Sequence, residues 1–268
     1  MLNGLLERFA GQELVLGWND EERKRIQISI DNLTSCIYRR LSRQVEEVFP
    51  FGSWTRNTIL PRKYDENSDI DLMVVFKGDN PSGQAESYKS VLREVVDEAY
   101  PRSYVRKDAP AVKLELDFIK YDLVPAIKVG WTNQYYIPST NPYSEWMATI
   151  PKELDPQLSQ MNRQHAGNLV RKVIRLCKYW NKSGNRTNLS SYELESLILR
   201  FFCGGVFVPT RTYDCFLKML AMIVGSGCQL QGDGTETSLQ WIETYRKYGT
   251  REKQLQWLNR LLPGVAAV

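Results

Sequence analysis

The sequence is poor in the residues that build zinc centres and disulfide frameworks. It contains one histidine, His165, and five cysteines, which are odd in number and lack the paired spacing of a zinc site. These counts disfavour both a Cys/His zinc cluster and a disulfide scaffold. We assign His165 a surface or helix role rather than a catalytic one, so any chemistry must use carboxylates, hydroxyls and metal ions.

Long apolar runs are also missing. The N-terminal stretch MLNGLLERFAGQELV carries Glu7 and Glu13 among its leucines, unlike the basic start and continuous apolar core of a signal peptide. The most apolar stretch, around Phe216 to Val224, is interrupted by Lys218 and is too short to cross a bilayer. We therefore expect a cytoplasmic protein without a membrane span.

The composition is that of an ordinary globular protein. The 268 residues are 43% hydrophobic and 25% charged, with a net charge of +4, and this length suits one large domain or two lobes. The mild positive excess suits an anionic substrate, and it equally suits a solvated basic surface. Charge alone therefore leaves the substrate open.

Apolar residues recur at helical spacing near the N-terminus. Steps of three or four residues predict a long helix from about Asp20 to Val48, which Pro50 ends. Asn19, followed three residues later by Glu22, resembles a capping box at the start of this helix.

Strand-like runs and a second helix follow. The run IDLMVVF and the runs AVKLEL and FIKYDLVPAI, joined near Asp117–Phe118, predict strands, and residues 84–100 predict a helix. Helical periodicity then dominates beyond a boundary near residues 151–155. We predict an α+β fold of two lobes, with a mixed β-sheet and an N-terminal spine helix in residues 1–155 and a helical lobe in residues 156–268.

Two aspartates stand two residues apart where the first β-rich run begins. On a strand, Asp69 and Asp71 point to the same face, while Ile70 and Leu72 point into the core. Neighbouring carboxylates repel each other, and a divalent cation offsets that repulsion best. Alone, the pair also fits two solvent-facing aspartates at a strand edge. Its position at the mouth of a buried strand favours a metal site.

A Gly-Ser dipeptide, Gly52–Ser53, lies a short loop upstream of these acids. Glycine lets the backbone approach a ligand closely, and backbone N–H groups with the Ser53 hydroxyl can hold phosphate oxygens. A plain turn is the simpler interpretation of the dipeptide alone. Its combination with two aspartates entering an apolar strand is much rarer and favours a phosphate-binding loop.

A third carboxylate is expected from a neighbouring strand. In FIKYDLVPAI, Tyr121 and Leu123 alternate onto one face and leave Asp122 on the other. An acid beside apolar residues needs a partner if it is buried. Asp117 is the competing candidate, but it stands where the two strands turn, so we favour Asp122.

Basic residues form a stripe in the first part of the helical region. Arg171, Arg175, Lys178 and Lys182 follow one another at steps of four, three and four. Such a stripe is usually a solvated helix face. Opposite a metal-binding pair it could instead neutralise a triphosphate.

The segment LSSYE begins a further helix. Ser190 and Glu193 fit a capping box, and a helix N-terminus with spare hydroxyls also binds phosphate. Tyr192 has two equal interpretations, which are stacking on a base and packing in the core.

Taken together, these motifs resemble a known superfamily. The elements FGSWTRNT, SDIDLMVVF and YDLVPAI are similar to the Gly-Ser, D-x-D and third-Asp pattern of polymerase β-like nucleotidyltransferases. Within that group the chain is most similar to the bacterial CD-NTases, relatives of cyclic GMP–AMP synthase and oligoadenylate synthase. A spine helix, a KYW segment and a later SSYELE helix occur in the same order, and the resemblance covers roughly residues 20–205.

The resemblance implies an enzyme that makes a cyclic di- or trinucleotide second messenger from nucleoside triphosphates. Asp69, Asp71 and Asp122 would be catalytic and would hold two Mg²⁺ ions, with Mn²⁺ as a possible substitute. Gly52 and Ser53 would bind the nucleotide, as would the residues that the family pattern adds, namely Lys178 for the triphosphate, Ser191 for a phosphate and Tyr192 for the base. A downstream effector in antiphage defence would respond to the product.

The family pattern also sets limits and alternatives. The zinc thumb of animal cyclic GMP–AMP synthase is missing from the sequence, so double-stranded DNA sensing is not supported. We expect a monomer without membrane partners. The same acids would also serve an enzyme that adds nucleotides to the 3′ end of RNA or tRNA. A third hypothesis is an inactive nucleotide-binding regulator.

Overall fold

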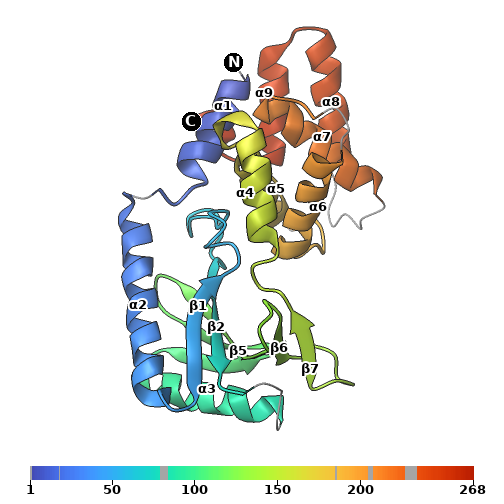
Figure 1. The fold of residues 1–268 in the computed structure, drawn as a ribbon. Helices are drawn as coiled ribbons and strands as arrows, with labels where there is room; N and C mark the ends of the chain where they lie inside the picture. Colours follow the sequence, from blue (N-terminus) through green and yellow to red (C-terminus); the bar gives the residue numbers. More distant parts are fainter. Residues whose placement is uncertain (1, 18, 79–83, 185, 205–207, 227–233) are drawn as a thin grey trace. The chain divides into compact units, whose positions relative to one another are not determined.

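The computed structural model describes residues 2–17, 19–78, 84–184, 186–204, 208–226 and 234–268. Two units divide the chain (Figure 1). The sheet unit comprises Leu16–Arg62 and Asn67–Glu153, and the helical unit comprises Met1–Val15, Lys63–Glu66 and Leu154–Val268. The short segment 63–66 therefore belongs to the helical unit, although the chain on both sides of it belongs to the sheet unit.

The sheet unit is built on a seven-stranded mixed sheet, in which β1-β2-β5-β4-β3 is the strand order and β6 pairs with β5 and β7. Only the β2–β5 pair is parallel among the strand pairs of the described residues. The strands are β1 (Val45–Phe51), β2 (Asp69–Phe76), β3 (Tyr104–Asp108), β4 (Ala111–Glu115), β5 (Lys120–Lys128), β6 (Tyr135–Pro138) and β7 (Trp146–Thr149).

Alternation along the strands separates the two faces of this sheet. One face packs Ile70, Leu72, Tyr121 and Leu123 into a core with residues of helices α2 (Glu21–Leu41) and α3 (Ala85–Ala99). The other face carries a smaller apolar cluster, which contains Met73 and other residues of β1, β2, β4, β5 and β6. The odd-numbered acids of β2 point to this second face.

The structure corrects the prediction for the first helix. Helix α2 ends at Leu41 instead of Val48, and the apolar residues that extended its stripe belong to strand β1. Pro50 lies within β1, where it is tolerated because β1 ends the strand order and needs no ladder bond on its outer side. The N-cap is Asp20, and Glu22 accepts a hydrogen bond from the Arg62 backbone instead of forming the predicted capping box.

The remaining strand predictions are confirmed, with additions. Strands β2, β4 and β5 and helix α3 occur where the sequence predicted them, and Asp117 lies in the turn between β4 and β5. Strands β3, β6 and β7 were not predicted. They are four or five residues long, too short for alternation to stand out from the surrounding loops.

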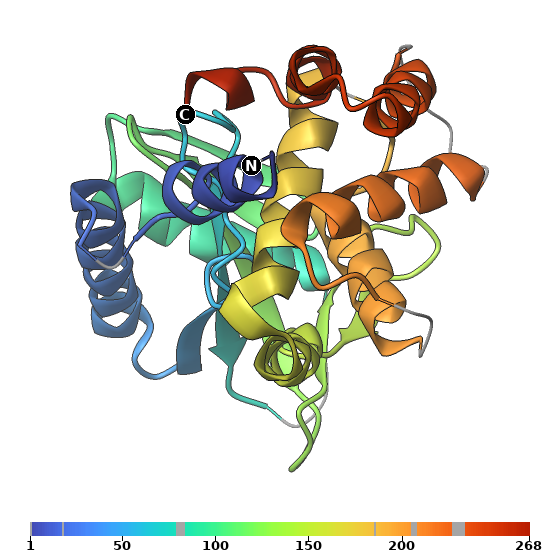
Figure 2. The ribbon, with the colours of Figure 1, turned by 90° about the horizontal axis from the view of Figure 1, so that it is seen from above.

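The helical unit contains α1 (Leu2–Arg8) and a π-helical turn, Phe9–Glu13, from the N-terminus, and then α4 (Leu154–Gln164), α5 (Leu169–Gly184), α6 (Ser191–Cys203), α7 (Thr212–Gly225), α8 (Thr235–Lys247) and α9 (Arg251–Leu261). Short 3₁₀ turns lie at Ala166–Asn168 and Val265–Ala267. Helix α5 packs against α4, α6 and α7 (Figure 2). Its buried residues lie all around its circumference.

Central burial of α5 corrects the interpretation of the basic stripe as a solvated helix face. Arg175 and Lys178 are buried, and Arg175 donates a hydrogen bond to the Ala10 carbonyl. The helical pattern is also broken at Gly167, whose φ of 68° separates α4 from α5. The stripe therefore mixes two internal cations with partly exposed ones.

Segment 63–66 is fixed within the helical unit by Tyr64. The Tyr64 ring meets Phe9 and Tyr179 edge to face, with centroids 5.8 and 5.4 Å away. Its hydroxyl donates to Glu13 Oε2 at 2.5 Å, and this bond, with that of Lys63, holds the pKa of Glu13 below its ordinary value. Four residues thus make a polar and an aromatic attachment to the helical unit.

Stacked aromatic rings join the last two long helices. Trp241 of α8 stacks on Tyr245 at 5.5 Å and on Trp257 of α9 at 5.9 Å, and Arg260 lies 4.1 Å from the Trp257 ring centre. No helix among the described residues is both long and apolar enough to cross a membrane. The four described cysteines are free, and Cys228 lies outside the described residues.

Candidate active site

Strand register brings the predicted carboxylates together on one face of the sheet unit. Strands β2 and β5 run parallel, and Asp71 is the direct register partner of Asp122. Asp69 lies two residues earlier on β2 and therefore points to the same side. The residues between them, Ile70 and Tyr121, are fully buried on the opposite face. Two strand starts therefore place three acids side by side.

Gly52 lies directly against one of these acids. It follows Phe51, the last residue of β1, which is the register partner of Asp71. The φ of Gly52 is +74°. A Cβ atom at this position would overlap Oδ2 of Asp71 and lie 3.0 Å from its Cγ. Both the positive φ and the close approach require glycine. The Gly52 backbone therefore approaches the Asp71 carboxylate closely, and its predicted approach to a ligand stays a prediction.

The turn after Gly52 presents backbone N–H groups outward. The Gly52 carbonyl accepts from Arg56 N and Thr55 Oγ1, and the Ser53 carbonyl accepts from Thr58 N and Ile59 N at 2.9 and 3.1 Å. The N–H of a trans peptide points opposite to its C=O. The N–H groups that follow these two carbonyls consequently point away from the turn, as a phosphate-binding loop requires.

Arg23 of helix α2 packs against this turn. Arg23 lies 4.5 Å from the Trp54 ring centre and donates to the Leu16 carbonyl, and both Arg23 and Trp54 are buried. Arg25, two residues further, lies 3.9 Å from the Phe118 ring centre in the β4–β5 turn. Helix α2 therefore holds both the Gly-Ser turn and the turn that leads into the strand of the third acid.

A lysine that was not predicted stands beside the acids. Lys113 on β4 is the register partner of Asp122, and its Nζ lies 3.2 Å from Asp122 Oδ2. Burial raises the pKa of Asp122, and the Lys113 charge offsets part of that rise. Burial disfavours the Lys113 ammonium, yet the carboxylates around it raise its pKa above the ordinary value. The acid cluster therefore has an internal counter-ion.

The donor set suits a hard divalent cation. Three carboxylates on adjacent strands supply only oxygen ligands, which Mg²⁺ and Mn²⁺ prefer. As the side chains stand, no three acid, thiol or imidazole groups among the described residues are grouped closely enough to hold a metal ion. The backbone and ligand types therefore fit the metal, while the Asp122 carboxylate is engaged with Lys113.

Lys178, predicted to contact a triphosphate, is buried within the helical unit. Its Nζ lies 3.3 Å from Glu195 Oε1 of α6, and the two side chains are 5% and 0% exposed. This ion pair joins α5 to α6 and was not predicted, because the sequence gives no sign that Glu195 faces inward. The role of Lys178 in nucleotide binding stays a prediction.

Lys178→Met is expected to lower the free energy of unfolding by about 3–5 kcal/mol, because Glu195 would keep a buried charge without this partner. Urea denaturation followed by circular dichroism measures the change. Lys182→Met is the matched control on the same helix, because the Lys182 side chain is 42% exposed and its Nζ lies 3.8 Å from Asp65 Oδ2. This substitution should lower the free energy of unfolding by less than about 1 kcal/mol. Equal losses in the two variants would contradict the prediction.

The start of α6 contains the predicted capping box. The Ser190 hydroxyl accepts from Glu193 N, and Glu193 accepts from Ser190 N at 2.8 Å. Ser191 is the first helical residue. Tyr192 is 52% exposed, so its interpretation as a core residue is wrong. Phosphate binding by Ser191 and base stacking by Tyr192 stay predictions.

Comparisons with known proteins agree with this geometry. The family model "Second Messenger Oligonucleotide or Dinucleotide Synthetase domain" matches residues 7–162. A Bacillus cereus (strain VD146) protein named "Probable cyclic nucleotide synthase" is 25% identical over 214 residues, which cover 65% of this chain and 62% of that protein. The CCA-adding enzyme of Picrophilus torridus is 23% identical over 192 residues, which cover 69% of this chain and 38% of the enzyme. The chain thus spans less than two thirds of either relative.

A solved structure shows the same fold over almost the full chain. The structure of E. coli MS115-1 CdnC with ATP superposes with a TM-score of 0.72 at 15% identity and covers 98% of each chain. The predicted α+β fold of the polymerase β-like type is confirmed. The family match covers more than half of the chain and includes the Gly-Ser turn and all three acids. This chain therefore belongs to the Second Messenger Oligonucleotide or Dinucleotide Synthetase family, the bacterial CD-NTases of the polymerase β-like nucleotidyltransferase superfamily.

Proposed function

We propose that this protein joins ribonucleoside triphosphates without a template and closes the product into a cyclic di- or trinucleotide. The observation that carries the proposal is the direct pairing of Asp71 with Asp122 on neighbouring parallel strands, under the backbone of Gly52. Family membership supports it, as does the similarity to a protein named for cyclic nucleotide synthesis.

The chain's own groups suit nucleotidyl transfer. Asp69, Asp71 and Asp122 would hold two Mg²⁺ ions, which supply Lewis-acid activation of a ribose hydroxyl and neutralise charge on the leaving pyrophosphate. The outward N–H groups of the Gly52–Ser53 turn would orient phosphate oxygens and favour the charge that develops on them. The attacking ribose hydroxyl and the α-phosphate must also be held in line with the leaving pyrophosphate. Fixing both reactants supplies much of the catalysis, because phosphoryl transfer depends chiefly on positioning and electrostatics.

The helical unit would supply the remaining nucleotide contacts. By family resemblance, Lys178 contacts the triphosphate, Ser191 a phosphate and Tyr192 the base. The half-exposed ring of Tyr192 supports its assignment. For Lys178, nucleotide binding requires the ammonium to contact a phosphate as well as Glu195. The Lys178→Met variant should therefore have a higher KM for nucleotide in addition to its lower stability.

The product decides the function. The protein is incubated with the four ribonucleoside triphosphates, labelled at the α-phosphate, and Mg²⁺ or Mn²⁺, and the mixture is then treated with phosphatase. A phosphatase-resistant small molecule with the mass of a cyclic di- or trinucleotide is expected. Release of pyrophosphate with only linear, phosphatase-sensitive products would contradict cyclisation.

An enzyme that elongates RNA is the second candidate, and the match to a CCA-adding enzyme favours it specifically. The two functions use the same acids but different acceptors. Including tRNA in the same assay separates them, because label retained on the RNA after phosphatase indicates tailing. Nucleotide binding without pyrophosphate release under any of these conditions would instead indicate the inactive regulator.

The product would be a second messenger in antiphage defence, read by a separate effector protein. We further propose that the enzyme acts as a monomer. Light scattering during size-exclusion chromatography measures the mass against the 31.0 kDa of the chain, and a dimer mass would contradict this assignment.

A further inference from the structure

A row of charged residues crosses four strands on the face that carries the acids. Asp71 pairs with Asp122, Asp122 with Lys113, and Lys113 with Arg106 of β3. Direct register partners point to the same side of a sheet. The row therefore runs from two carboxylates to two cations, and Lys113 stands at the change of sign.

Lys113 has two acidic partners at different distances. Its Nζ lies 3.2 Å from Asp122 Oδ2 and 3.6 Å from Oδ2 of Asp108, at the end of β3. The Lys113 and Asp122 side chains are 28% and 20% exposed, whereas Asp108 is 46% exposed. The Lys113 ammonium is thus closer to Asp122, the more buried acid. It can reach Asp108 by a movement of its side chain alone, with the strands and their register unchanged.

We propose that Lys113 is a positioning residue that serves as a replaceable counter-ion for Asp122, and that its charge passes to Asp108 when a divalent cation is bound. This inference rests on the proposed function of the acids as metal ligands. Two positive charges on one carboxylate would oppose each other. Asp108 gives Lys113 another partner, so the ammonium need not remain uncompensated beside the metal.

The same ion pair occupies one of the three acids in this structure. Oδ2 of Asp122 lies 3.2 Å from the Lys113 ammonium, so a metal ion would have to share or displace this contact. Lys113 would therefore weaken metal binding by competition and support turnover by fixing the carboxylate.

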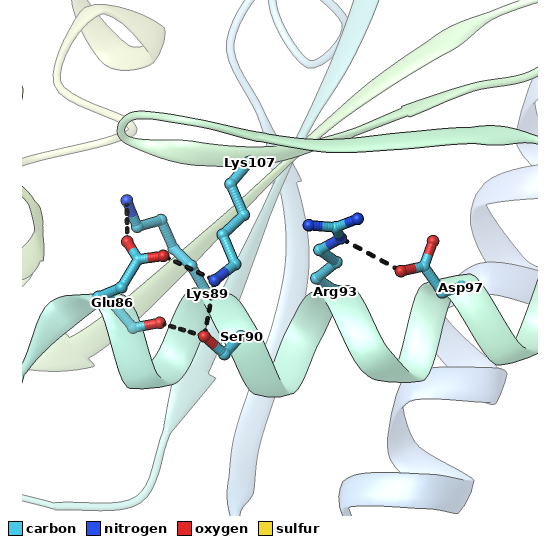
Figure 3. A network of polar contacts seen from close by, with 6 residues as sticks. All are labelled: Glu86, Lys89, Ser90, Arg93, Asp97 and Lys107. Atoms are coloured by element: carbon cyan, nitrogen blue, oxygen red, sulfur yellow. Dashed lines mark hydrogen bonds and ion pairs between the residues drawn. The ribbon is translucent and has the colours of Figure 1, made fainter.

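Lys107 provides a matched control. It lies on β3, one residue after Arg106, and its side chain is 27% exposed, as against 28% for Lys113. Figure 3 shows its ammonium on the α3 side of the sheet, bonded to Glu86 at 2.6 Å and Ser90 at 2.7 Å. Substitution of Lys107 removes a comparable paired lysine from the opposite face.

The test measures binding of Mn²⁺ alone to the nucleotide-free proteins by calorimetry, and pyrophosphate release separately. Lys113→Met should bind Mn²⁺ several-fold more tightly than wild type and turn over about tenfold more slowly. Asp108→Asn should bind Mn²⁺ several-fold more weakly, because Lys113 loses its alternative partner. Lys113→Arg, which keeps the charge, should restore both values toward wild type, and Lys107→Met should change neither.

Tighter Mn²⁺ binding in Lys113→Met together with weaker binding in Asp108→Asn is a pattern that general loss of structure does not produce. Unchanged or weaker Mn²⁺ binding in Lys113→Met overturns the proposal, and so does turnover equal to that of wild type. Unchanged or tighter binding in Asp108→Asn also overturns it. If Lys113→Met does not fold, Lys113→Arg and Asp108→Asn retain the test. A wild-type protein that releases no pyrophosphate would refute the proposed function, while the Mn²⁺ affinities would still decide the role of Lys113.

Discussion

Gly52→Ala is expected to lower turnover about 100-fold, because displacement of a catalytic group by about an ångström has an effect of that size. The added methyl group would overlap Oδ2 of Asp71, so either the carboxylate or the turn must move. The positive φ of 74° adds backbone strain for any residue with a Cβ atom. Initial rates of pyrophosphate release at saturating nucleotide measure the loss.

Gly130→Ala separates the two causes. Gly130 lies in the β5–β6 turn of the same unit and has a φ of +51°. Apart from its chain neighbours, no described residue has a heavy atom within 4 Å of the position that a Cβ atom would take there. This control therefore imposes left-handed strain without a clash, and it should retain turnover. If both variants lose activity equally, backbone strain explains the loss and the close approach to Asp71 does not.

Asp69→Asn combined with Asp71→Asn is expected to lower pyrophosphate release by about 1000-fold or more, because amides lose the charge that binds and balances the metal ions. Asparagine keeps the size of aspartate, so the overlap argument at Gly52 is unaffected. Circular dichroism and the urea midpoint should show that the double variant folds. A folded double variant with wild-type turnover would refute the assignment of these acids.

Asp117→Asn is the control for this pair. Asp117 was the competing candidate for the third acid, and it is exposed in the turn between β4 and β5. Removing its charge should leave turnover within about twofold of wild type, since the charge of an exposed side chain is strongly screened by water and salt. Loss of activity in this variant would move the third ligand from Asp122 to Asp117.

The acid cluster was predictable because strand geometry has a period of two. Alternation at the starts of β2 and β5 placed Asp69, Asp71 and Asp122 on the face opposite Ile70, Leu72, Tyr121 and Leu123. Lys113 could have been found by the same reasoning. A hairpin centred between Asp117 and Phe118 pairs position 113 with position 122, so the predicted turn already implied the ion pair.

Other features depend on tertiary contacts that local patterns do not carry. The apolar spacing from Leu41 through Val45 to Val48 fits a helix, yet Val45 begins a strand that pairs with β2. Similarly, the basic stripe of α5 gave the spacing of a surface helix. The helix is instead packed by neighbours around its circumference, and a buried partner, Glu195, accounts for Lys178.

The assignment of residues 63–66 to the helical unit limits how this protein can be dissected. The polypeptide passes from one folding unit to the other at four places, after positions 15, 62, 66 and 153. A single cut near 153 would leave Tyr64 attached to the excised sheet, while its partners Phe9 and Tyr179 would be on different pieces. Deletion mapping is therefore a poor tool for this molecule, and point substitutions are the appropriate one.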